Sequence, residues 1–305
     1  MGDLFDEIAE MFRRDNDVFL KYNSKIIECL DECSYEKNYI MSDGQTKYFL
    51  NEASMDYYNA RNLQKYYHRD LKDLDINIAK FLHINSQNDQ FGKNKVYSVF
   101  TFVEGESLDK YLPNVDEEES YSLGLKLGKI LKDLQKAEID YSTHHVGPWK
   151  QSYIYTYKGI VNKYVSNPLT DKVFEFYKNN FDVISHMDKS ALSKFLNGKL
   201  TLNSIVVKDK ELGLRNMSAI TIGDPNYEFL FISQIALTSP TFASALLNGY
   251  FDNQIPDNFF PILKFYTSEL LLSKYYELSN DEIIKIIDSY DDYSLVIPKW
   301  YKKSL

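Results

Sequence analysis

The sequence predicts an α+β protein of two lobes, with a small β-rich lobe ahead of a larger helical one. Two observations carry this prediction. The segment Val96–Val103 (VYSVFTFV) is dense in β-branched and aromatic residues, which is typical of a strand. After it, leucines recur at helical spacing over residues 117–137, behind three glutamates that suit the first turn of a helix. A chain of 305 residues has room for two compact lobes.

The order of patterns divides the chain into three predicted parts. Residues 1–30 form an N-terminal helical extension, residues 31–103 a lobe with an antiparallel sheet and one helix, and residues 104–305 a helical lobe. Apolar residues recur at helical spacing through the extension: Phe5, Ile8, Ala9, Phe12, Phe19, Tyr22, Ile26 and Leu30.

Within the first lobe, a turn at Ser42-Asp43-Gly44 predicts a hairpin between Tyr39–Met41 and Lys47–Leu50. Residues 55–72 look helical, with Tyr58, Leu63, Tyr66 and Tyr67 as the apolar face. The second lobe is mostly helical, including residues 256–290. Two β-like runs interrupt it at Ser204–Val207 and Ser218–Ile222.

Composition excludes several classes of protein. Hydrophobic residues make up 44% and charged residues 26%, which argues against disorder. The net charge of -9 argues against nucleic-acid binding, because phosphate backbones are held by Lys and Arg. No apolar run approaches the roughly 20 residues of a membrane span, and the start MGDLFDEIAEMF has no signal-peptide character. We therefore expect a cytoplasmic protein that binds neither nucleic acid nor membrane.

Two pairs of residues could suggest a metal. Cys29 and Cys33 stand four apart, and His144 and His145 are adjacent. Neither pair has the companions that a metal site needs, so the sequence predicts reduced thiols and no metal site.

Several segments, in order, resemble the bacterial aminoglycoside-phosphotransferase and choline-kinase-like family. They are VYSVFTFVEGESLDKYL (96–112), LGLKLGKILKDLQKA (123–137), Gly223-Asp224-Pro225 with Tyr227-Glu228-Phe229, the segment 248–271 and PKWYKK (298–303). The resemblance implies a bilobal protein-kinase-like fold and a transferase ancestry. It implies that the hinge Thr101, Phe102, Val103 and Glu104 would contact a nucleotide.

The resemblance also places the catalytic loop, which reads HGDxxxxN in the family. The matching stretch here is 197–204, inside a hydrophobic frame. The family's His is Asn197, its base Asp is Lys199 and its metal-binding Asn is Ser204. Losing the base alone is worth about 10²–10⁴ in rate.

The remaining nucleotide positions are also replaced. The metal-binding acids that precede the family's GDP segment fall on Asn216 and Ser218, and Asn is a poor substitute for a carboxylate on a hard cation. The cation of the third strand falls on Asn51, and its partner Glu in the following helix falls near Gln64. The turn at 34–38 (SYEKN), which would cover the phosphates, has no glycine.

We therefore expect a pseudokinase that binds a protein partner or small ligand without ATP or magnesium. The alternative is an active phosphotransferase that uses ATP, magnesium and other residues, for which Asp209, Glu211 and Asp224 are the candidates. A third hypothesis places an anion between Lys199 and Arg215.

The other residues also have structural interpretations that assign them no chemical role. Asp224 suits a turn before Pro225, and Asp209 and Glu211 suit a solvated turn between strands. Trp149 suits packing. Asp291 and Asp292 would either correspond to the acids that bind substrate amines in the family or be solvated acids without a binding role.

Overall fold

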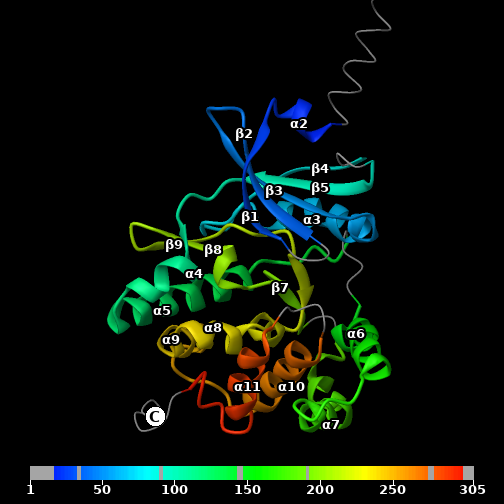
Figure 1. The fold of residues 1–305 in the computed structure, drawn as a ribbon, viewed down its shortest axis with the longest axis vertical. Coiled ribbons are helices and arrows are strands. Elements are labelled where there is room, and N and C mark those ends of the chain that lie inside the picture. Colours follow the sequence, from blue (N-terminus) through cyan, green and yellow to red (C-terminus); the bar gives the residue numbers. More distant parts are fainter. Residues whose placement is uncertain are drawn as a thin grey trace, which may run out of the picture. The chain divides into compact units, whose positions relative to one another are not determined.

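The computed structural model describes residues 17–32, 36–88, 92–142, 147–189, 192–273 and 278–297. The chain divides into two compact units (Figure 1). Unit 1 comprises Met1–Asp73, Asn77–Glu104 and Gly213–Ala219, and unit 2 comprises Leu74–Ile76, Gly105–Leu212 and Ile220–Leu305.

Unit 1 contains an antiparallel sheet whose strand order is β1-β2-β3-β5-β4. The predicted hairpin and the predicted strand after it are both confirmed, and Gly44 has the positive φ of 96° that the hairpin turn requires. The strands are β1 (Lys25–Glu32), β2 (Glu36–Ser42), β3 (Lys47–Ser54), β4 (Phe81–Asn88) and β5 (Asn94–Thr101).

The strand β1 corrects the prediction that residues 25–30 are helical. Helical structure in the described part of the extension is limited to the single turn α2 (Val18–Lys21). The pairing of β1 with β2 has two irregularities, between Ile26 and Glu28 and between Cys29 and Asp31. Such irregularities break the alternation of a strand, so β1 does not show the period-two pattern by which a strand is recognised.

The two faces of the sheet are covered differently. One face carries an apolar cluster of Val18, Met41, Leu50, Tyr97 and Val99. The other carries Phe49 and Phe100, and the ring of His68 on α3 (Tyr58–Asp70) lies 5.5 Å from the Phe100 ring.

The helix at 58–70 is confirmed, but its predicted apolar face is wrong. Arg61, Gln64 and His68 are the buried residues of α3, whereas Leu63 and Tyr66 are 43% and 36% exposed. The reason is that Arg61 and Gln64 face polar groups, Glu36 and Ser218 O, while the His68 ring packs near Phe100.

The segment 213–219 belongs to unit 1, although the sequence places it with the helical lobe. Backbone hydrogen bonds explain this: Ala79 N donates to Leu214 O over 2.9 Å, and Leu214 N donates to Asn77 O over 2.9 Å. The chain therefore carries the predicted metal-loop residues out of unit 2 and into unit 1.

Unit 2 holds helices and short strands. The predicted helix after the hinge is confirmed as α5, with Leu123, Leu127, Leu131 and Leu134 buried. The helices are α4 (Leu108–Tyr111), α5 (Glu117–Leu134), α6 (Trp149–Lys163), α7 (Asp171–Asn179), α8 (Ile232–Thr238), α9 (Pro240–Phe251), α10 (Phe259–Leu272) and α11 (Asn280–Asp288). The strands are β6 (Glu106–Ser107), β7 (Lys194–Leu196), β8 (Ile205–Lys208), β9 (Glu211–Leu214) and β10 (Thr221–Gly223).

Two contacts organise unit 2. Helices α5 and α9 pack closely because glycines face the contact: a Cβ on Gly128 would lie 2.3 Å from Leu246 O. Helices α6, α7, α10 and α11 share an aromatic core that includes Tyr153, Tyr177 and Phe265. Among the described residues, no helix has both the length and the apolar character needed to span a membrane.

Candidate functional site

The predicted catalytic stretch is a half-buried loop of unit 2 between β7 and β8. Gly198 has a φ of 80°, and the loop ends in a 3₁₀ turn at Leu202–Ser204. The hydroxyl of Ser204, which is 3% exposed, accepts from Thr201 N over 3.1 Å and donates to Thr201 O over 2.7 Å. The Ser204 side chain is therefore bonded to the backbone of the same loop.

Glu228 anchors this loop from the 3₁₀ turn Pro225–Phe229. Its Oε2 accepts a hydrogen bond of 2.8 Å from Asn197 N. Burial raises the pKa of the Glu228 carboxyl to about 8, and the backbone amides of Asn197 and Gly198 act in the opposite direction. The sequence singled out Tyr227-Glu228-Phe229 as a motif but assigned Glu228 no role, because its partner stands 31 residues earlier.

Asp224 is fully buried and structurally occupied, as the turn interpretation predicts. Its side chain accepts from Asn226 N over 2.9 Å, from Tyr266 OH over 2.8 Å, and lies 3.4 Å from His186 Nε2. The hydrogen bond to Asp224 raises the pKa of His186. Trp149 joins the same group through its Nε1, which donates to Tyr266 OH over 3.1 Å, so its packing role is confirmed.

The other candidates for a rescued active site lie at a hairpin, Asp209 in its turn and Glu211 at the start of β9. Asp209 and Lys210 have φ values of 52° and 63°, which is the geometry of a two-residue turn between β8 and β9. Glu211 pairs with Lys126 over 2.6 Å, and Lys210 pairs with Glu119 over 2.9 Å. The expected turn between strands is confirmed.

In unit 1, the predicted metal-loop segment lies against the hinge. Arg215 Nε donates to Val103 O over 2.9 Å, and its guanidinium carbon lies 4.6 Å from the centre of the Phe102 ring. Asn216 Oδ1 accepts from Ser218 N over 2.9 Å, which makes a local turn.

Neighbouring hinge residues are also engaged. The hydroxyl of Thr101 accepts from Lys80 N over 2.8 Å, and Glu104 pairs with Lys47 over 3.4 Å. Gln64 on α3 donates through Nε2 to Ser218 O. The structure therefore gathers the hinge, Gln64 and the segment 215–218 within one unit.

Asn51 is fully buried in the middle of β3. Its Nδ2 donates to Asn38 Oδ1 over 2.8 Å and to Glu36 Oε2 over 3.2 Å. These acceptors fix the orientation of the amide, so its Oδ1 points away from them, and this oxygen has no hydrogen-bond partner among the described residues. At the position where the resemblance implies a cation, the structure therefore has a neutral amide whose donor is already engaged.

Taken unit by unit, these side chains do not fit a magnesium-bound triphosphate. Mg²⁺ prefers carboxylate oxygens and phosphates prefer cations. Position 199 presents a lysine, the Ser204 and Asn216 side chains bind their own backbone, and position 51 is an amide. No group of three or more metal-ligating His, Cys, Asp or Glu side chains occurs in the part of the chain that the structure describes.

The remaining predicted residues lie elsewhere. Asp291 pairs with Lys264 over 2.7 Å and with Lys172, so its charge is met by two lysines. Cys29 is exposed on β1. Some of the residues singled out in the sequence lie outside the described residues: His144, His145, Cys33, residues 34–35 of the predicted phosphate-covering turn and PKWYKK (298–303).

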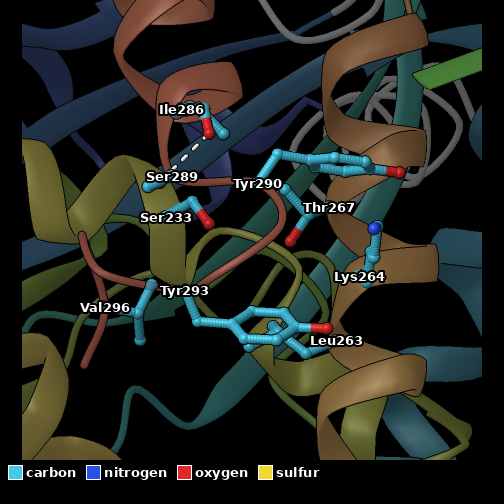
Figure 2. A pocket seen from close by; sticks show the side chains of 9 residues that line it. All are labelled: Ser233, Leu263, Lys264, Thr267, Ile286, Ser289, Tyr290, Tyr293 and Val296. Carbon is cyan, nitrogen blue, oxygen red and sulfur yellow. Dashed lines mark hydrogen bonds between the residues drawn. The ribbon is translucent and has the colours of Figure 1, made fainter. Parts of the chain in front are cut away.

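Two of the cavities formed by described residues lie in unit 2. The first, shown in Figure 2, lies between α10 and the residues after α11, and its lining includes Lys264 and Tyr290. Its volume of about 10 Å³ has room for one water molecule at most. The second has about 470 Å³ and is lined in part by Thr201, Leu202 and Asn203 of the predicted catalytic stretch, with Asp109 and Glu282. Its size is within the range of ligand sites.

The sheet unit and the helical unit, with the loop between β7 and β8, have the protein-kinase-like fold. Solved structures of aminoglycoside phosphotransferases share this fold. Similar solved structures include amicoumacin kinase hAmiN in complex with AMP-PNP, Ca²⁺ and Ami, with a TM-score of 0.63, 12% identity, and coverage of 98% of this chain and 97% of that chain.

Two aminoglycoside phosphotransferases show the same likeness. APH(4)-Ia matches with a TM-score of 0.63, 15% identity and coverage of 94% and 97%, and the streptomycin–ATP complex of APH(2")-IIa matches with 0.58, 14% and coverage of 95% and 97%. No family model matches the sequence, and no curated protein matches it. At these identities the likeness establishes the fold.

Proposed function

We propose that this protein is a pseudokinase with the aminoglycoside-phosphotransferase fold, a non-catalytic protein that binds a partner or small ligand without magnesium. The observation that carries the proposal is the chemistry at four positions: Asn197, Lys199, Ser204 and Asn216 stand where the resemblance implies a catalytic His, a base and two metal ligands.

The hydrogen bonding of these residues supports the proposal. Ser204 and Asn216 each spend a side-chain oxygen on a local backbone amide, in Thr201 and Ser218. Lys199 would bring a positive charge to the position of a base, which opposes both proton abstraction and the binding of a divalent cation. A phosphotransferase of this fold depends on positioning and electrostatics for its rate, so these replacements act on the terms that matter most.

The test is thermal unfolding of the full chain with ATP, in the presence of Mg²⁺ and in the presence of EDTA. A ligand at 100 times its Kd stabilises the folded state by about 2.7 kcal/mol. We expect no shift in Tm that depends on magnesium. A magnesium-dependent shift of several degrees would contradict the proposal.

A gain-of-function variant checks the correspondence of positions. Lys199→Asp/Ser204→Asn/Asn216→Asp restores the family's residues at three of them, and we expect a magnesium-dependent Tm shift in this variant. The unmodified protein is also assayed for phosphate transfer to streptomycin, which binds the similar APH(2")-IIa. Measurable transfer would favour the alternative of an active phosphotransferase that uses other residues.

A further inference from the structure

A row of buried polar side chains crosses the sheet of unit 1. Asn38 on β2, Asn51 on β3 and Ser98 on β5 are direct cross-strand neighbours, and each is 0% exposed. Glu36 stands two residues before Asn38 and so shares its face of β2. Polar groups buried in a sheet face destabilise the fold unless they find partners, so this row indicates a specific structural use.

Helix α3 is joined to this face of the sheet through Glu36. Arg61 Nη2 pairs with Glu36 Oε2 over 2.7 Å, and the two side chains are 7% and 1% exposed. The same oxygen accepts from Asn51 Nδ2 over 3.2 Å. One carboxylate therefore joins β2, β3 and α3.

The polarity of this pair differs from the one that the resemblance implies. The family's arrangement has the cation on the third strand and the acid on the helix, at positions 51 and 64. Here both of those positions are amides. The acid is on the sheet at Glu36, and the cation is on the helix at Arg61, one turn before Gln64.

We propose that the buried Glu36–Arg61 pair is a positioning device that holds α3 against the sheet without a nucleotide. Gln64 extends the hold, because its Nε2 donates to Ser218 O in the segment 215–218. Removing one member of a buried ion pair leaves the other charged and desolvated, whereas an exposed pair contributes little. Glu36 falls in the predicted phosphate-covering turn 34–38, where the structure has the start of β2, and the inference stands independently of catalysis.

Hydrogen exchange of the α3 amides, measured on the full chain, tests the proposal. Arg61→Met leaves Glu36 buried without its cation, and we expect α3 amides to exchange about 100-fold faster or more, with the α5 amides of unit 2 unchanged. Arg69→Met is the matched control, because Arg69 is on the same helix but is 45% exposed beside Asp70. We expect this control to change α3 exchange by less than about threefold.

The charge-swapped variant Glu36→Arg/Arg61→Glu separates pairing from general damage. We expect it to restore α3 protection to within about tenfold of the unmodified protein, because the pair re-forms with opposite polarity. If the swap is as fast to exchange as Arg61→Met, or if Arg61→Met resembles the Arg69→Met control, the proposal is overturned. Arg61→Lys keeps the charge and loses the forked geometry, so an intermediate increase, about tenfold, is expected even if Arg61→Met does not fold.

Adding Mg-ATP to the unmodified protein distinguishes this inference from the proposed function. We expect α3 exchange to stay within about twofold. A large increase in protection would contradict the pseudokinase proposal, while the contrast between Arg61→Met, the swap and the control would still decide the role of the pair.

Discussion

The buried carboxyl of Glu228 predicts an unusual dependence of stability on pH. Its pKa is about 8 in the folded protein, and the ordinary value in an unfolded chain is about 4.3. Between these values the folded state holds a proton that the unfolded state has released. Stability from this group is therefore complete at low pH and is lost as the pH rises through the folded pKa.

The magnitude follows from the size of that window. One pKa unit corresponds to about 1.4 kcal/mol, so the contribution of Glu228 should fall by roughly 3 kcal/mol between pH 5 and pH 8. The substitution Glu228→Gln keeps an oxygen that can accept from Asn197 N but removes the titration. The free energy of unfolding of the unmodified protein, minus that of Glu228→Gln, should therefore decrease by roughly 3 kcal/mol over this range.

Urea denaturation followed by circular dichroism at pH 5, 6, 7 and 8 measures this difference. Taking the difference between the two proteins cancels the titration of other groups. If the difference stays constant from pH 5 to pH 8, Glu228 is ionised throughout, and the two backbone amides outweigh its burial.

Three further predictions can be checked with the same denaturation assay. Gly128→Ala should destabilise the fold by about 1–3 kcal/mol, because its Cβ would lie 2.3 Å from Leu246 O. Gly159→Ala, with nothing within 4 Å of its Cβ, should instead stabilise α6 by about 0.5–1 kcal/mol. Equal effects of the two substitutions would contradict the close packing of α5 on α9. Asp224 raises the pKa of His186, so the pair stabilises the fold below the unfolded pKa of about 6.5 and this stabilisation is lost as the pH rises through the folded pKa. His186→Gln should remove this pH-dependent stabilisation. An unchanged dependence of stability on pH would mean that the pair does not form. Tyr266→Phe should cost about 1–3 kcal/mol because Asp224 loses a buried donor, and a cost below 0.5 kcal/mol would argue against that hydrogen bond.

Strong local patterns were enough to predict much of the fold. The strand at 94–101 and the helix at 117–134 are dense in the residue types that their burial requires, so sequence alone places them. The strand β1 escaped prediction because its bulges remove the alternation, and most of its described side chains are exposed, so burial imposes no pattern there.

The buried face of α3 could not be predicted from hydrophobic periodicity. Arg61, Gln64 and His68 occupy it because their partners, Glu36, Ser218 and Phe100, are brought there by distant parts of the chain. A single sequence gives the spacing of residues along one element and no information on which polar group faces it. The anchoring of Asn197 by Glu228 was missed for the same reason.

The resemblance gave information that hydrophobic periodicity does not give, because it assigned residues from separate segments to one site. Gln64, Ser218 and the hinge were assigned to one site from separate motifs, and the structure places them in one unit, with Gln64 bonded to Ser218 and Arg215 bonded to Val103. Arg215 was a candidate for an anion contact. Its Nε instead donates to a hinge carbonyl and its guanidinium stacks on Phe102, so part of its hydrogen-bonding capacity is already spent inside unit 1.

Local hydrogen bonds also engage three other positions that the resemblance assigned to the nucleotide and metal site. Asn51 binds Asn38 and Glu36, Ser204 binds Thr201, and Asn216 binds Ser218. A buried polar group destabilises the fold less once it is paired, and these side chains are paired within their own unit, although Asn51 Oδ1 has no partner among the described residues. Each of these three side chains therefore already has a hydrogen-bond partner in its own unit, and this predicts a fold whose stability does not depend on Mg-ATP.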